Sequence, residues 1–324
     1  MKNKIIVTGG CGFIGSHLCE SLVKNGYDVI AFDRYNISNN YGWLEESKFR
    51  KNIEIILGDI RDFDSVNNLM KKAKKCIHLA ALIGIPYSYV SPLAYIKTNI
   101  EGTYNVLETA RNLNYDELII TSTSEIYGTA QFTPMDETHP ISPQSPYAAS
   151  KVAADQIALS YFKSFKLPVK IVRPFNVYGP RQSPRAIIPA IINQFINSKN
   201  LNLGNIDTIR DYTYVDDTVS AFLQILRSNK FYGDVVNVGS NHPVKIREII
   251  SLVSKFFNKS LKITKDKKRL RPTKSEVLEL VCDNSKIKKH LLWKNKIDFK
   301  KGLAKTINWN KKNINNFKKN LYHV

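Results

Sequence analysis

Short apolar runs alternate with longer amphipathic stretches through the first half of the chain. Five of these runs are rich in Ile, Val and Leu, and they span residues 4–8, 28–32, 53–57, 75–79 and 117–121. Such runs are typical of parallel strands that are buried on both faces. Helix-length stretches, among them 16–25 and 99–112, separate them. We therefore expect an α/β fold with a Rossmann-like, doubly wound parallel sheet.

The alternation loosens beyond about residue 175. A further apolar run over 169–173 ends at Pro174, and prolines recur at positions 180, 184 and 189. A helix is expected over 217–227 and a strand over 235–238. These features predict a first domain over residues 1–175, to which the chain returns around 211–239. A smaller C-terminal α/β domain that binds substrate is expected over residues 176–324.

The composition is that of a globular protein with its own core, with 43% hydrophobic and 23% charged residues. No apolar stretch approaches the roughly 18 residues that a membrane-spanning helix needs. The four cysteines have neither CxxC pairs nor regular spacing, so neither a disulfide framework nor a structural metal site is indicated; they are Cys11, Cys19, Cys76 and Cys282. We expect a cytoplasmic protein without a membrane partner.

The positive charge is concentrated at the C-terminal end of the chain. Residues 251–324 contain 21 Lys and Arg but only 5 Asp and Glu, and so account for most of the net charge of +20. Such a region can bind nucleic acid, which would make association fall steeply with salt. The basic residues are interspersed with Ile, Leu and Trp, as on ordinary amphipathic helices. We therefore predict no nucleic-acid partner.

A glycine-rich loop directly follows the first predicted strand. Gly9, Gly12 and Gly15 are three residues apart at a strand-to-helix turn, where glycines permit a tight turn and close approach of a pyrophosphate to the helix N-terminus. Asp33 closes the second strand, eighteen residues after Gly15. A carboxylate there can accept hydrogen bonds from a ribose 2′-hydroxyl and repels a 2′-phosphate. These residues predict a dinucleotide site that prefers NAD over NADP, although Arg34 leaves room for NADP.

Tyr147 and Lys151 are four residues apart, so a helix would place both side chains on one face. A lysine in this position, together with the positive nicotinamide ring, would lower the phenol pKa and make Tyr147 a usable base.

Several motifs, in order over at least residues 4–240, resemble those of the extended short-chain dehydrogenase/reductase family. They are Thr8-Gly-Gly-Cys-Gly-Phe-Ile-Gly15, Asp59-Ile60, His78-Leu-Ala-Ala81, the Tyr147–Lys151 pair and Arg173-Pro-Phe-Asn-x-Tyr-Gly-Pro180. The resemblance implies an NAD enzyme that acts on nucleotide-sugars, with Tyr147 as acid/base and Lys151 on the nicotinamide ribose. It also implies a homodimer. The implied cofactor-binding residues are Gly9, Gly12, Phe13, Ile14, Gly15, Asp33, Asp59, Ile60, Leu79, Ala80, Ala81, Thr98 (or Asn99), Tyr147, Lys151 and Pro174.

The segment Thr121-Ser-Thr-Ser-Glu-Ile-Tyr-Gly128 indicates the subclass. By resemblance, Thr123 hydrogen-bonds the sugar 4-hydroxyl beside Tyr147. Simple 4-epimerases of the family have small uncharged residues where this chain has Ser124 and Glu125. Once C4 is a ketone, Glu125 could remove the acidified C5 proton while water leaves from C6. This predicts a nucleotide-sugar 4,6-dehydratase. Ser124 departs from the Asp-Glu pair of dTDP-glucose dehydratases but matches the Thr-Ser-Glu of GDP-mannose dehydratases.

UDP-glucuronate decarboxylases also use Thr-Ser-Glu, and they remain the principal alternative. Segments 129–137 and 269–276 resemble those of the N-acetylglucosamine 4,6-dehydratases of legionaminic acid biosynthesis, so UDP- or GDP-N-acetylglucosamine is the expected substrate. A 4-epimerase and a catalytically idle dinucleotide-binding protein are further alternatives. The nucleotide is expected to bind to Asn176, Arg185, Arg210 and Arg271, because guanidinium groups pair with phosphate oxygens bidentately.

Overall fold

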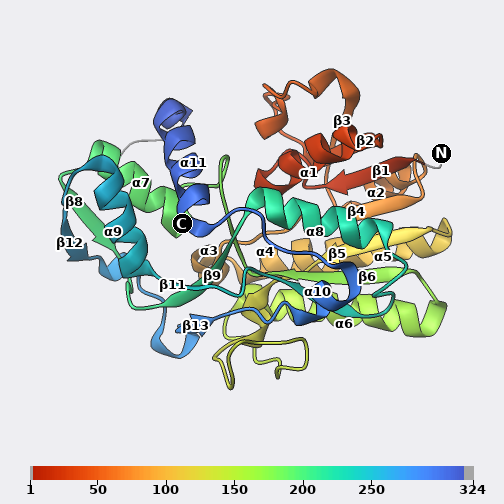
Figure 1. The fold of residues 1–324 in the computed structure, drawn as a ribbon. Helices are drawn as coiled ribbons and strands as arrows, with labels where there is room; N and C mark the ends of the chain where they lie inside the picture. The colour runs from red at the N-terminus through yellow and green to blue at the C-terminus, as the bar shows by residue number, and fades with distance from the viewer. Residues whose placement is uncertain (1–2, 317–324) are drawn as a thin grey trace.

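The computed structural model describes residues 3–316 and contains a seven-stranded parallel sheet (Figure 1). Its strand order is β10-β6-β5-β4-β1-β2-β3. The strands are β1 (Lys4–Thr8), β2 (Asp28–Arg34), β3 (Ile53–Gly58), β4 (Lys75–His78), β5 (Glu117–Thr121), β6 (Val169–Pro174) and β10 (Val235–Val238). The strands predicted from apolar runs, and the Rossmann-like fold class, are confirmed.

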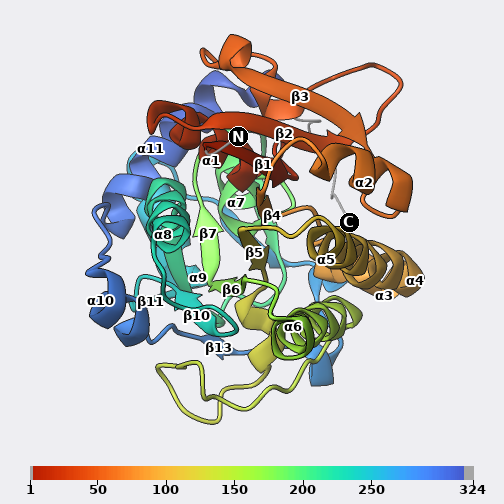
Figure 2. The same cartoon turned by 90° about the vertical axis from the view of Figure 1, so that its right-hand side faces the viewer.

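Helices cover both faces of this sheet. Figure 2 shows α1 (Phe13–Lys24) and α8 (Val215–Arg227) on one side, with α2 (Phe63–Met70), α5 (Gly102–Asn112) and α6 (Pro146–Phe165) on the other. Successive side chains of a strand point to opposite faces. Accordingly, Ile5 and Val7 of β1 join one hydrophobic cluster and Ile6 joins the other. This double burial explains why the strands are apolar without polar alternation.

The order of the strands reverses between β1 and β4. These two strands pair in parallel with each other, and the next strand is β2 on the side of β1 and β5 on the side of β4. In open α/β sheets, ligands bind outside the carboxyl ends of the strands at such a switch point. The glycine loop follows β1 and residues 79–81 follow β4, so both lie at this edge.

The predicted helices differ from the observed ones mainly at their starts. Helix α1 begins at Phe13 rather than residue 16, because Gly12 is its N-cap. The predicted helix over 99–112 is divided into a π-helical turn, η3 (Ile96–Glu101), and α5. Helix α8 begins at Val215, two residues before its expected start. Each difference lies at a helix terminus, where local sequence signals are weakest.

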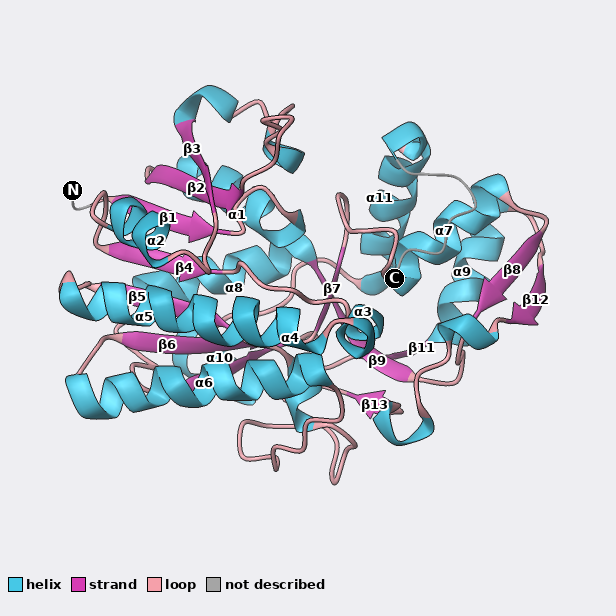
Figure 3. Cartoon of the chain, turned by 180° about the vertical axis from the view of Figure 1, so that it is seen from behind, coloured by secondary structure: helices cyan, strands magenta, loops and turns pink. Residues whose placement is uncertain are grey.

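Smaller sheets and further helices lie beyond the carboxyl edge of the large sheet (Figure 3). Strand β9 (Ile209–Tyr214) pairs with β7 (Asn176–Tyr178), β11 (Pro243–Lys245) and β13 (Glu279–Leu280), while β8 (Asn200–Leu203) pairs with β12 (Lys262–Lys265). The α-helices of this part are α7 (Ile187–Asn197), α9 (Ile246–Phe257) and α11 (Phe299–Lys312), whereas α10 (Ser285–Leu291) packs beside the edge strand β10 of the large sheet. The division at residue 175 stays a prediction.

Short helical elements complete the described chain. They are η1 (Gly42–Leu44), η2 (Arg50–Asn52), α3 (Ile85–Val90), α4 (Pro92–Tyr95), η4 (Ser124–Tyr127), η5 (Lys267–Arg269), η6 (Thr273–Ser275) and η7 (Ile314–Asn316). Among residues 3–316, no helix combines the length and the apolarity needed to cross a bilayer. The end of the predicted basic region and C-terminal domain, residues 317–324, lies outside the described residues.

Candidate active site

In the glycine loop, a side-chain Cβ would fit at one of the three glycines and would clash at the other two. Gly9 has φ of +70°, and a Cβ there would lie 2.9 Å from the backbone nitrogen of Ala80. A Cβ at Gly15 would lie 2.0 Å from the carbonyl oxygen of Gly9. A Cβ at Gly12 would meet only that same oxygen, at 3.2 Å. Gly12 therefore marks the side from which a pyrophosphate can approach the N-terminus of α1, where no side chain caps the helix. Phe13 and Ile14 form the first turn of this helix.

Asp33 lies beside this loop at the end of β2. Its two carboxylate oxygens accept hydrogen bonds from the backbone N–H groups of Cys11 and Arg34, each at 2.8 Å. Burial raises the pKa of Asp33, and these two hydrogen bonds oppose the rise. The carboxylate is thus fixed next to the glycine loop, and each oxygen keeps a second lone pair for a ribose hydroxyl. The structure fits the adenosine half of a dinucleotide at this position.

The loop after β4 lies against the glycine loop. Ala80 packs against Gly9, and its backbone N–H donates to Thr8 Oγ1 at 3.2 Å. Thr8 Oγ1 also lies 2.7 Å from Nδ1 of His78. Burial, with the charge of Lys151, lowers the pKa of His78 to about 3, so this imidazole is neutral. The backbone N–H of Leu79 donates to the carbonyl oxygen of Thr8 at 3.1 Å, and Ala81 follows Ala80 in the same loop.

The remaining predicted cofactor residues differ in how they are held. Asp59 forms an ion pair with Arg61, and Ile60 is buried against Gly102. Thr98 is half-buried in η3. Its neighbour Asn99 is buried, exchanges two hydrogen bonds with the backbone of Leu82 and donates to Ser150 Oγ at 2.9 Å. Pro174 ends β6, paired with Val238 of β10.

Tyr147 and Lys151 lie one turn apart at the start of α6, and both are buried. Burial raises the pKa of the Tyr147 phenol, the side chain of Thr123 opposes this rise, and the charge of Glu125 adds to it. The protein alone therefore keeps the phenol protonated. The lowering of this pKa by Lys151 and the nicotinamide ring together, which the sequence predicts, stays a prediction.

Lys151 occupies the inner end of this pair. Its ammonium donates to the carbonyl oxygen of Thr121 at 2.6 Å. Burial lowers the pKa of Lys151 to about 8, and the charge of Asp155 opposes this shift. An ammonium with one protein acceptor has further donors for a ligand hydroxyl.

A change of Lys151 to Met is expected to alter how stability depends on pH. The folded-state pKa of Lys151, about 8, lies below that of the unfolded chain. Between these two pKa values Lys151 binds more protons in the unfolded chain than in the folded one. The contribution of Lys151 to the free energy of unfolding therefore increases as the pH rises from about 8 to about 10. Urea unfolding of both proteins across this range measures the difference. Parallel pH dependence of the two would contradict the burial of Lys151 as a charged group.

A buried polar network that the sequence analysis missed supports the Tyr147 helix from behind. Asp155 Oδ2 accepts from Ser122 Oγ at 2.8 Å and from Arg173 Nε at 3.2 Å. Arg173 in turn donates to the hydroxyl of Tyr127 at 3.0 Å, and Tyr127 donates to Asn237 at 2.7 Å. The spacing of Asp155, four residues after Lys151, was the available signal. The network connects α6, β6 and β10 to the loop after β5.

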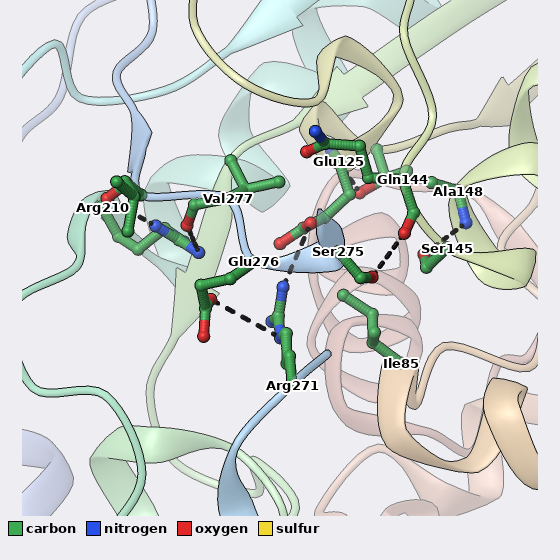
Figure 4. Close-up of polar contacts among 12 residues, drawn as sticks. Ile85, Glu125, Gln144, Ser145, Ala148, Arg210, Arg271, Ser275, Glu276 and Val277 are labelled. Carbon is green, nitrogen blue, oxygen red and sulfur yellow. Dashed lines mark hydrogen bonds and ion pairs between the residues drawn. The ribbon is translucent and has the colours of Figure 1, made fainter. Parts of the chain in front are cut away.

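Thr123, Ser124 and Glu125 follow β5 and start the η4 turn. Thr123 caps this turn by accepting from the backbone N–H of Glu125 at 3.3 Å. Ser124 is buried and Glu125 is half-buried. Figure 4 shows the Glu125 carboxylate facing Arg271, whose Nη1 lies 3.5 Å from Glu125 Oε2. The structure therefore gathers Thr123, Tyr147 and Glu125 at one point.

The four predicted nucleotide-binding residues are placed differently from one another. Arg210 is buried, and its guanidinium donates to the carbonyl oxygens of Ile209, Val277 and Leu278. Arg185 is exposed, and its charge acts on Tyr95, whose ring lies 6.2 Å from that of Tyr147.

Asn176 and Arg271 have unused polar atoms. Asn176 Oδ1 and Arg271 Nη1 are buried without a hydrogen-bond partner among the described residues, as is the hydroxyl of Tyr212, which the sequence analysis did not single out. Arg271 is thus available to an anion, whereas the donors of Arg210 already have backbone acceptors. Within residues 3–316 no group of three or more His, Cys, Asp and Glu side chains could hold a metal ion.

Comparison with known proteins agrees with this geometry. The family model for GDP-mannose 4,6 dehydratase matches residues 6–306. The chain is 33% identical over 325 residues to the dTDP-D-glucose 4,6-dehydratase of Homo sapiens, with 97% of this chain and 92% of the human protein covered.

Solved structures show the same similarity. One is DesIV, a dTDP-glucose 4,6-dehydratase from Streptomyces venezuelae with NAD and TYD bound, at TM-score 0.89 and 27% identity, covering 97% of this chain and 99% of DesIV. Another is UDP-glucuronic acid 4-epimerase from Bacillus cereus with UDP-glucuronic acid and NAD, at TM-score 0.87 and 30% identity, covering 95% and 99%. The expected NAD cofactor agrees with both. The chain therefore belongs to the nucleotide-sugar 4,6-dehydratase and 4-epimerase family of extended short-chain dehydrogenase/reductases.

Proposed function

We propose that this protein is an NAD-dependent nucleotide-sugar 4,6-dehydratase. The observation that supports it most directly is the carboxylate of Glu125, half-buried and close enough to Tyr147 for its charge to raise the phenol pKa. Epimerisation at C4 needs no carboxylate there. Elimination of water across C5 and C6 needs a base for the C5 proton.

When bound, NAD would supply the hydride acceptor for C4 and the hydride donor for C6, and a proton added at C5 would complete the product. The glycine loop and the N-terminus of α1 would hold its pyrophosphate, and Asp33 would accept hydrogen bonds from its adenosine ribose. Residues 79–81 would contact the cofactor from the loop after β4. Lys151 would donate to the nicotinamide ribose, since its ammonium has a single carbonyl acceptor in the protein.

Tyr147 would take the proton of the sugar 4-hydroxyl as C4 becomes a ketone. Thr123, whose side chain acts on the phenol, would orient the 4-hydroxyl toward it. Burial of the phenol opposes its ionisation, so the positive charges of Lys151 and of the nicotinamide ring must favour it. Asn99 acts on this pair through Ser150, whose hydroxyl donates to the backbone carbonyl of Tyr147, and Asp155 acts on the pair by its charge.

Glu125 would then remove the C5 proton, which the neighbouring C4 ketone acidifies. The electron pair of the broken C5–H bond forms the C5–C6 double bond, and the C6 hydroxyl leaves after accepting a proton. Ser124 has no acidic proton to supply, so this proton must come from Glu125, Tyr147 or water. The nucleotide would be held by Asn176, Arg185 and Arg271, while Arg210 would support the backbone of the segment that carries Arg271.

We favour UDP- or GDP-N-acetylglucosamine as the substrate, and resemblance of segments 129–137 and 269–276 supports this choice. A 4-epimerase is the second candidate, because the 4-epimerase of Bacillus cereus is as similar in structure as DesIV. Glu125 distinguishes the two, since only elimination uses it as a base.

Mass spectrometry of long incubations tests the proposal directly. The protein is incubated with NAD and a panel of UDP-, GDP- and dTDP-hexoses, N-acetylhexosamines and UDP-glucuronate. Loss of one water from one panel member is the expected result and also names the substrate. Loss of carbon dioxide from UDP-glucuronate would show a decarboxylase, and a change of sugar configuration without change of mass would show an epimerase.

We also propose that the protein is a cytoplasmic homodimer that uses the α3–α6 side. Exposed apolar side chains occur on these elements, among them Val90, Leu93, Ile96, Tyr104 and Phe165. The four cysteines are all buried and unpaired, as is usual in a reducing compartment.

Replacing Leu93 and Tyr104 together with Asp is expected to convert dimer to monomer, because burial of two carboxylates in an apolar interface is unfavourable. Light scattering coupled to size-exclusion chromatography measures the mass of both proteins. A monomeric wild type would contradict this arrangement.

A further inference from the structure

The segment over residues 270–278, which we call the crossing segment, reaches from the substrate side of the molecule to the Tyr147 helix. Ser275 Oγ donates to the carbonyl oxygen of Gln144, just before the N-cap of α6, and lies 2.5 Å from the hydroxyl of Tyr89 on α3. Arg210 holds the carbonyl oxygen of Val277 at 2.7 Å. Figure 4 shows the contacts of Ser275 with Gln144 and of Arg210 with Val277, with Arg271 between them. The crossing segment is therefore fixed on both sides of the site.

Arg271, near the start of this segment, lies between two carboxylates without a hydrogen bond to either. Its guanidinium nitrogens lie 3.5 Å from Glu125 Oε2 and 4.0 Å from Glu276 Oε1. Both distances exceed those of a charge-assisted hydrogen bond. Arg271 Nη1 is also buried with no hydrogen-bond partner in residues 3–316. The guanidinium is neutralised by charge, but its donors are unused.

A diphosphate would compete strongly for these donors. It carries more negative charge than a carboxylate, and its oxygens match the geometry of a guanidinium fork. A diphosphate beside Arg271 would also repel the Glu125 carboxylate at close range. Arg271 therefore cannot serve Glu125 and the diphosphate equally well at the same time.

We propose that Glu125 and the diphosphate of the substrate compete for Arg271, so that Arg271 restrains the Glu125 carboxylate until the diphosphate binds and then releases it toward the sugar ring. Arg271 is then a positioning residue for Glu125 as well as a ligand of the nucleotide. This inference rests on the proposed function, because it needs a nucleotide-sugar and a base at Glu125. The competition couples recognition of the nucleotide to the release of the Glu125 carboxylate, the general base.

A double-mutant cycle on nucleoside diphosphate binding tests the competition without measuring turnover. Calorimetry gives the Kd of UDP, GDP and dTDP for the wild type, Glu125→Gln, Arg271→Gln and the double variant, each with NAD present. In the presence of Arg271, Glu125→Gln should tighten binding by about 3–10-fold, because it frees the guanidinium. In the Arg271→Gln background the same change should alter Kd by less than about 2-fold.

Two further variants control the experiment. Glu279→Gln neutralises a carboxylate on β13, just beyond the crossing segment, and should leave Kd within about 2-fold. Arg271→Lys keeps the charge but loses the fork, and should retain part of the coupling. Urea unfolding checks that each variant is folded.

The possible outcomes separate this inference from the proposed function. Tightening by Glu125→Gln to the same extent with and without Arg271 would mean simple repulsion between Glu125 and the ligand, and would overturn the competition alone. No change of Kd in Glu125→Gln would overturn it too. Failure of the wild type to bind any of the three nucleoside diphosphates would overturn the proposed function and the inference together.

Discussion

Tyr147→Phe is expected to lower kcat by about 10²–10⁴-fold, the usual contribution of a positioned general acid or base. The change removes only the hydroxyl, and the ring keeps its packing against Tyr95 at 6.2 Å. Without that hydroxyl, no group takes the proton of the sugar 4-hydroxyl, so even the first oxidation should fail. Absence of transient reduced-nicotinamide absorbance in single-turnover experiments is the measurement.

Tyr95→Phe is the matched control. Tyr95 is buried beside Tyr147, but its hydroxyl donates to the backbone carbonyl of Gly84. Loss of this neutral hydrogen bond should cost about 0.5–1.5 kcal/mol of stability and leave the chemistry in place. Equal losses of kcat in the two variants would show that the Tyr147 effect is structural and would remove its assigned role.

Glu125→Gln should separate the two halves of the reaction. The variant keeps the size of the side chain but has no basic carboxylate, so oxidation at C4 should continue while release of dehydrated product falls by about 10²–10⁴-fold. The transient reduced-nicotinamide absorbance should therefore persist for longer than in the wild type. Rapid mixing with absorbance detection, followed by mass analysis of the product, measures both steps.

Glu276→Gln is the control for loss of a negative charge beside Arg271. Glu276 faces the same guanidinium, at 4.0 Å, from the crossing segment. Its neutralisation should change the product yield far less than that of Glu125, because it is given no proton to move. Normal dehydration by Glu125→Gln would refute the role assigned to Glu125 as the base that removes the C5 proton.

The large sheet and the cofactor loop could be predicted from the sequence because their signals are local. A strand that is buried on both faces must be apolar throughout, and the pattern of Gly9, Gly12 and Gly15 follows from contacts within a single turn. The Tyr147–Lys151 pair is equally local, since four residues span one helical turn. These features need no knowledge of the remainder of the chain.

The substrate side could not be predicted in the same way, because its contacts join distant residues. Arg210 was expected on the diphosphate, yet its guanidinium holds backbone carbonyls 67 and 68 residues further along the chain. The contact between Glu125 and Arg271 likewise depends on the path of the crossing segment. No spacing in the sequence specifies such pairs, and only the folded chain brings them together.

Asp155 could be predicted only in part. Its position on the same helical face as Lys151 follows from the sequence, but the reason for a carboxylate there does not. That reason is the buried guanidinium of Arg173, which comes from the next strand and needs an anion beside it. The sequence analysis assigned Arg173 to a family motif and did not connect the two.

The position of β10 limits how this chain can be divided. This strand comes from residues 235–238 and pairs with β6, so the large sheet is completed only after much of the substrate side has been synthesised. A fragment cut near residue 175 would expose β6 as an unprotected edge, which is prone to pair with other chains. It would also leave the buried ammonium of Lys170 without its carbonyl acceptors at Ile225 and Ser228. A chimera that exchanges substrate specificity must therefore transplant two separate stretches of sequence and keep this late strand with the cofactor half.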